Sequence, residues 1–60
     1  MNFMIKQLVV EVEDSLVSFI EDIEQIQEDL PEEKKIFSQL EKLKERLKSD
    51  LEFLEKINER

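Results

Sequence analysis

Several residue types are missing from this chain of 60 residues: it has no cysteine, histidine, tryptophan, tyrosine or glycine, and a single proline. Without cysteine there is no disulfide and no thiolate metal ligand, and without histidine the commonest transition-metal ligand is missing too. A chain of this size buries little surface, so small domains usually need a disulfide, a metal or a partner chain. The composition therefore predicts association with another chain, with no metal and no cofactor.

The lack of glycine also restricts the fold class. Tight β-hairpin turns favour glycine because they need positive φ angles, so a multi-stranded sheet is disfavoured. The one proline, Pro31, lies just past the midpoint and is followed by two glutamates. Proline suits the first turn of a helix and disfavours helix in the preceding residue, and acidic residues favour a helix N-terminus. The sequence therefore predicts a helix over about residues 3–29, a turn near 29–31 and a helix over about residues 31–58.

Apolar residues recur with heptad spacing in both halves of the chain, which is typical of amphipathic helices. The series in the first half is Ile5, Val9, Val12, Leu16, Phe19, Ile23, Ile26 and Leu30. The series in the second half is Ile36, Leu40, Leu43, Leu47, Leu51, Leu54 and Ile57. Two amphipathic helices of similar length joined by a short turn predict an all-α fold, a two-helix antiparallel hairpin with coiled-coil-like packing.

The two series are compatible when they are matched outward from the turn. The facing pairs are Ile26 with Ile36, Ile23 with Leu40, Phe19 with Leu43, Leu16 with Leu47, Val9 with Leu54, and Ile5 with Ile57. Val12 is the exception, because it faces Asp50. A buried carboxylate without a partner is costly. We therefore expect Asp50 at the edge of the contact, solvated or paired with a base, and Leu51 within it.

Two other structures account for parts of the pattern. A single long helix, kinked at the proline, would bring Glu33, Lys44 and Asn58 into its apolar series. A strand over residues 8–13 followed by two helices would resemble a class of DNA-binding proteins. That arrangement needs a helix boundary near residues 14–18, where the sequence has no breaker, and it places an acidic strand on DNA. Both fit the sequence less well than the hairpin.

Additional apolar residues widen the apolar face of the first helix beyond the contact with the second. They include Phe3, Val10, Val17 and Ile20. An uncovered apolar patch usually marks an interface, and so short a chain has no further element to cover it. We expect these four residues to be buried by a second chain, with the first helix contributing more of the interface than the second. The second chain is either another copy, giving a four-helix bundle, or a protein partner.

Charge is divided unevenly along the chain. Residues 1–30 hold eight acidic residues and one base, Lys6, whereas residues 31–60 hold eight of each sign, and the net charge is −7. This sign disfavours direct binding to nucleic acid and to anionic membranes, and no apolar run approaches a membrane span. The candidate acidic partner face comprises Glu11, Asp14, Glu21, Asp22, Glu24 and Glu28. They are either a solvated face, paired with bases of the second helix or of a dimer mate, or a surface for a basic partner.

No arrangement of residues in the sequence predicts catalysis. Paired carboxylates need an enclosing pocket, which two helices do not provide, so we expect neither enzyme activity nor a small-molecule substrate. The sequence predicts a cytoplasmic, non-enzymatic interaction module, a small regulator or adaptor that acts as a homodimeric helical bundle. One alternative is the small subunit of a heteromer, similar to a co-chaperone or antitoxin, that masks a partner's apolar groove. The other is an acidic inhibitor or mimic directed at a nucleic-acid-binding protein.

Overall fold

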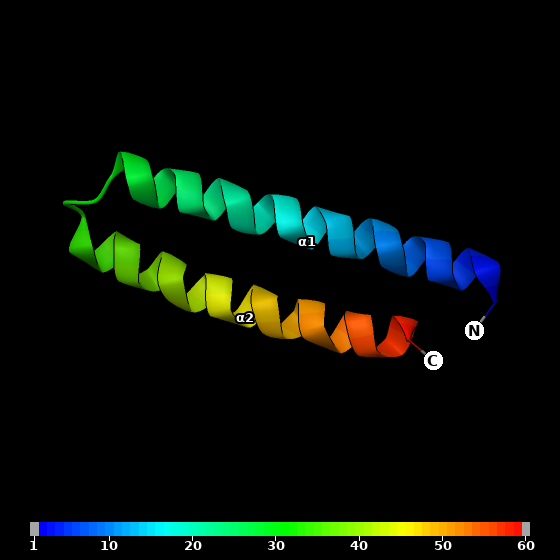
Figure 1. The fold of residues 1–60 in the computed structure, drawn as a ribbon. Helices are drawn as coiled ribbons and strands as arrows, with labels where there is room; N and C mark the ends of the chain where they lie inside the picture. Colours follow the sequence, from blue (N-terminus) through cyan, green and yellow to red (C-terminus); the bar gives the residue numbers. More distant parts are fainter. Residues whose placement is uncertain (1, 60) are drawn as a thin grey trace.

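The chain forms two antiparallel helices in a computed structural model that describes residues 2–59 (Figure 1). Helix α1 comprises Phe3–Asp29 and helix α2 comprises Lys34–Asn58. The helices lie side by side, with the turn at one end and both chain termini at the other. The predicted all-α hairpin is confirmed, and the single long helix and the N-terminal strand are excluded for these residues.

The start of α1 is set by a side-chain cap. The Oδ1 atom of Asn2 accepts a hydrogen bond from the backbone N–H of Ile5 at 3.0 Å. Asparagine is a preferred residue at this position, because its side chain satisfies an amide that has no partner within the first turn of the helix. An asparagine immediately before an apolar heptad series is therefore a sequence signal for where α1 begins.

The turn is longer than the sequence predicts. Helix α1 ends at Asp29, as expected, but α2 begins at Lys34 and not near residue 31. Leu30 has φ −129° and ψ 54°, and Glu33 has φ −85° and ψ 76°, so both lie outside the helical region. Helices often end in a residue with positive φ, usually glycine. None of the described residues has positive φ. The chain reverses instead through a turn at Pro31 and Glu32, where the backbone N–H of Glu33 donates a hydrogen bond to the backbone oxygen of Leu30 at 3.3 Å.

The contact between the helices is centred differently from the predicted heptads. Two apolar side chains are buried among the described residues, Ile20 at 7% exposure and Ile23 at 2%. The buried or half-buried positions of α1 are Val9, Glu13, Leu16, Ile20, Ile23 and Gln27. Those of α2 are Leu40, Glu41, Lys44, Leu47, Leu51, Leu54, Ile57 and Asn58. Of the eight members of the predicted first series, three therefore lie in the contact, Val9, Leu16 and Ile23, and the other five do not.

The predicted contact is wrong for six residues that the structure leaves exposed. These residues are Ile5, Val12, Phe19, Ile26, Ile36 and Leu43. A single neighbouring helix covers a narrower stripe than the apolar face of α1 provides, so part of the heptad series must point past α2. Glu13, Ile20 and Gln27 occupy the contact on the other flank of the stripe.

Two individual expectations have opposite outcomes. Ile20, expected beneath a second chain, is buried within the hairpin because it faces α2, and it is therefore not free to contact another molecule. Asp50 is exposed and Leu51 is half-buried, which confirms the prediction that Leu51, and not Asp50, lies within the contact between the helices.

The molecule is a single layer, one helix thick. Its Cα atoms extend over 46 × 15 × 10 Å, and its radius of gyration of 14.1 Å exceeds the roughly 10 Å of a compact 60-residue domain. Such a layer has two broad sides and almost no interior. Over residues 2–59, neither helix contains an apolar stretch long enough to cross a bilayer.

Candidate interaction surface

The two broad sides of the hairpin differ in chemistry. One side has a shallow pocket near the turn, which is lined by Glu24, Gln27, Glu28, Pro31, Phe37 and Lys44. We call this the polar side. Successive residues of a helix are rotated by about 100°, so the exposed apolar members of the heptads lie on the other side of the α1–α2 contact.

We call that second side the open face. It is defined by Ile5, Leu8, Val12, Phe19 and Ile26 of α1 and by Ile36 and Leu43 of α2, all of which are exposed. The α1 members follow one another at intervals of three, four or seven residues, so they form one stripe along the helix. Both helices thus present apolar side chains to the same side of the layer, and nothing within residues 2–59 covers them.

The open face contains a groove on α1. Its volume is about 390 Å³, and it is lined by Leu8, Glu11, Val12, Ser15, Leu16 and Phe19. Phe19 closes the end nearer the turn and is 53% exposed. A concave, mostly apolar strip on an otherwise flat helix surface is suited to receiving a large side chain from another molecule.

The outer edges of the open face, where each helix turns away from its neighbour, carry opposite charges. Along α1 the edge carries Glu11, Asp22 and Asp29. Along α2 it carries Lys35, Lys42 and Arg46. All six residues are exposed. Within residues 2–59, no ion pair closer than 4 Å joins an acid of α1 to a base of α2. These edge charges are therefore available to another molecule.

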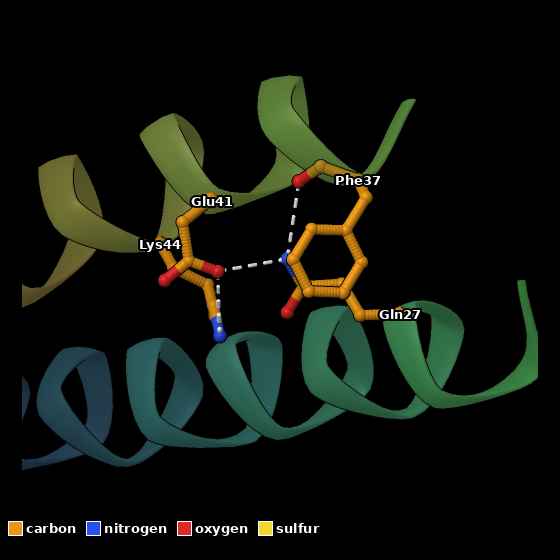
Figure 2. Close-up of polar contacts among 4 residues, drawn as sticks. All are labelled: Gln27, Phe37, Glu41 and Lys44. Carbon is orange, nitrogen blue, oxygen red and sulfur yellow. Dashed lines mark hydrogen bonds and ion pairs between the residues drawn. The ribbon is translucent and has the colours of Figure 1, made fainter. Parts of the chain in front are cut away.

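A polar cluster holds the helices together beside the turn (Figure 2). The Nε2 atom of buried Gln27, on α1, donates to the backbone oxygen of Phe37 at 3.2 Å and to Oε2 of Glu41 at 2.9 Å. Nζ of Lys44 lies 3.3 Å from the same Glu41 oxygen. The hydrogen bond from Gln27, followed by that from Lys44, lowers the pKa of Glu41 below its ordinary value of 4.5. The cluster fixes how the two helices are aligned along their length.

The Glu41–Lys44 ion pair joins residues three apart on α2. A second polar group lies in the contact without such support. The Oε1 atom of Glu13 is buried and has no hydrogen-bond partner among the described residues. A buried acceptor without a partner costs about 1–3 kcal/mol. Glu13 is therefore a weak point of the contact between α1 and α2.

The interface residues expected from sequence are only partly brought together. Phe3, Val10 and Val17 are exposed, as an interface with another chain requires, but helical periodicity places them on the polar side of α1. Ile20 is buried in the hairpin. The acidic residues Glu11, Asp14, Glu21, Asp22, Glu24 and Glu28 are all exposed and are spread over the outer surface of α1.

The heptad spacing predicts that four open-face residues of α1 contact α2, namely Ile5, Val12, Phe19 and Ile26. The available signal was the width of the stripe, because a helix with two apolar neighbours needs a wider face than a helix with one. These four heptad residues are exposed and lie outside the contact with α2.

Among residues 2–59, no three histidine, cysteine or acidic side chains come close enough together to hold a metal ion. Comparison of the chain with protein-family models, with curated proteins and with solved structures gives no match.

Proposed function

We propose that this protein is a non-enzymatic interaction module, a small regulator or adaptor, that acts as a homodimer in which two hairpins form a four-helix bundle. One observation carries the proposal: the hairpin presents an apolar face, built from both helices, that its own residues 2–59 leave uncovered. Large exposed apolar patches on small proteins mark interaction sites.

The surface area of the hairpin supports a partner of similar size. Its accessible surface is 4963 Å² for a mass of 7.3 kDa. A globular monomer of this mass exposes about 4,200 Å². The excess is about 800 Å², which matches the area that each partner buries in a protein–protein interface of ordinary size. One further hairpin packed on the open face is thus sufficient to bring the accessible surface area of each chain to that of a globular monomer.

A heteromer is the alternative that the same face supports, because a different protein can bury the same residues. The exposed acids of α1 do not support an acidic mimic to the same degree. Solvation alone accounts for the exposure of charged residues on the outer surface of a helix.

Sedimentation equilibrium of the purified protein tests the proposal. We expect a dimer at micromolar concentration, with helical content that falls as the dimer dissociates on dilution. Because the chain lacks tryptophan and tyrosine, interference optics are the suitable detection. A folded monomer at every concentration would exclude the homodimer, and an unfolded monomer would favour the heteromer.

A further inference from the structure

We infer that a second copy of this chain covers the open face in one orientation, with the two turns at the same end of the bundle and α1 of each copy lying beside α2 of the other. This inference rests on the proposed homodimer and specifies its geometry. Two hairpins can also stack with their turns at opposite ends, in which case α1 lies beside α1 and α2 beside α2. The distribution of charge and the shape of the open face distinguish the two arrangements.

The edges of the open face favour the arrangement that brings unlike helices together. The α1 edge carries acids only, and the single base of α1, Lys6, lies on the polar side. Any alignment of α1 against a second α1 therefore places acidic edges together. The α2 edge carries Lys35, Lys42 and Arg46, while the acids of α2 lie elsewhere on that helix, apart from Asp50 on the open face. Charge complementarity of this kind selects partners and fixes orientation.

The alignment of the hairpin also brings the opposite charges to the same levels. The hydrogen bond from Gln27 to the backbone of Phe37 shows that these two residues lie at about the same height along the layer. Both helices rise by about 1.5 Å per residue. Five residues away from the turn, Asp22 is therefore level with Lys42. Two residues toward the turn, Asp29 is level with Lys35.

A two-fold axis parallel to the helices preserves these levels in the second copy. The α2 helix of the second copy then stands beside α1 of the first, at the height of the first copy's own α2. Lys42 of the second copy lies beside Asp22, and Lys35 of the second copy lies beside Asp29. By the symmetry, each pair forms twice in the dimer. An axis perpendicular to the helices forms none of these pairs.

The groove on α1 supports the same orientation. Phe53 is the most exposed large apolar residue of α2, at 64% exposure, and helical periodicity places it at the α2 edge of the open face. By the same counting from Gln27 and Phe37, Phe53 is level with Glu11, one of the residues that line the groove. The parallel axis therefore sets Phe53 of the second copy against the groove of the first.

A cysteine cross-link tests the orientation directly, because the chain has no cysteine of its own. Glu32 is exposed within the turn. In the proposed dimer the two copies of Glu32→Cys lie on neighbouring layers, about 10 Å apart, and we expect a short bis-maleimide to link them nearly completely. Turns at opposite ends would separate them by most of the 46 Å length of the hairpin. In that arrangement a mixture of Glu32→Cys with Asn2→Cys would give linked heterodimers, whereas Glu32→Cys alone would give none.

A charge exchange tests the edge contacts. One variant carries Asp22→Lys and Asp29→Lys, and the other carries Lys35→Glu and Lys42→Glu. Each alone should lose at least about tenfold in dimer affinity, and an equimolar mixture should recover it as a heterodimer in which every edge pair is of opposite charge. Neither pair of substitutions destabilises the helix ends at the turn. Asp29→Lys puts a positive charge at the C-terminus of α1, and Lys35→Glu puts a negative charge at the N-terminus of α2, so both interact favourably with the helix dipoles.

The outcomes separate the inference from the function on which it rests. A wild-type protein that never dimerises refutes both. A dimer that fails the Glu32→Cys cross-link, or a dimer that the exchange of Asp22 and Asp29 strengthens, refutes the orientation and leaves the homodimer intact. A cross-linked Glu32→Cys dimer together with recovery of affinity in the mixture supports the orientation.

Discussion

Replacement of Phe19 by alanine is the most direct test of the open face. Phe19 belongs to the predicted heptad, yet it lies at the end of the α1 groove and is 53% exposed. If a second chain covers the open face, this exposed surface is buried only in the dimer. Phe19→Ala should therefore weaken dimerisation much more than it weakens the hairpin itself.

The magnitude follows from the exposed area. A phenylalanine side chain has about 200 Å² of surface, so about 100 Å² of Phe19 remains to be buried. At about 25 cal/mol per Å², its burial contributes about 2.5 kcal/mol per copy, of which alanine retains a small part. Two copies then lose about 4 kcal/mol, which raises the dissociation constant of the dimer about a thousandfold.

Sedimentation equilibrium measures this dissociation constant, and circular dichroism at high protein concentration shows whether the helices persist. Phe37→Ala is the matched control, because Phe37 is 39% exposed and lies on the polar side. We expect the control to keep the wild-type dissociation constant to within about threefold, or about 0.6 kcal/mol. If Phe19→Ala stays within the same limit, or if Phe37→Ala has the larger effect, the open face is not the interface.

Four further substitutions test other features of the molecule. Glu13→Leu should raise the free energy of unfolding by about 1–2 kcal/mol at fixed protein concentration, because it removes a buried oxygen without a partner. Chemical denaturation measures this change, and a loss of stability would show that Glu13 has an unrecognised partner. Val12→Glu should abolish dimerisation and Val17→Glu should preserve it, as judged by size-exclusion chromatography with light scattering; the reverse result would move the interface to the polar side. Glu41→Gln should be less stable than the wild type at neutral pH. Because folding lowers the pKa of Glu41, this difference should be complete above the ordinary pKa of 4.5 and disappear as the pH falls through the lowered value; denaturation curves at several pH values would contradict the reasoning if the difference grew in acid.

The hairpin itself was predictable because its signals are local. Pro31 and the heptad spacing specify two helices and the place where they separate. The pairing of the two series also predicts Asp50 at the edge of the contact and Leu51 within it, which the structure confirms. The start of α2 was not predictable to the residue. It depends on how many non-helical residues the reversal needs, and that number depends on the packing of the two helices against each other.

The side of the hairpin that stays open was harder to predict, because a heptad pattern gives the width of an apolar stripe and not its division between neighbours. Phe19 and Ile20 are adjacent in sequence and similar in hydrophobicity, yet one is exposed and the other is buried. Their placement depends on the rotation of α1 about its own axis. With the rotation that the structure shows, Gln27 and Lys44 lie within the contact near the turn, and the side chain of each bonds to Glu41.

The unequal burial along the hairpin has a consequence for how the chain folds. All four buried residues lie in the half of the layer next to the turn: Ile20, Ile23, Gln27 and Lys44. The described residues of the half next to the termini are at most half-buried, as Val9 and Leu54 are. Contacts close to a turn join residues near in sequence, so they form early at a small cost in chain entropy. Folding should therefore begin at the turn and spread toward the termini, with amide protons exchanging fastest near the chain ends.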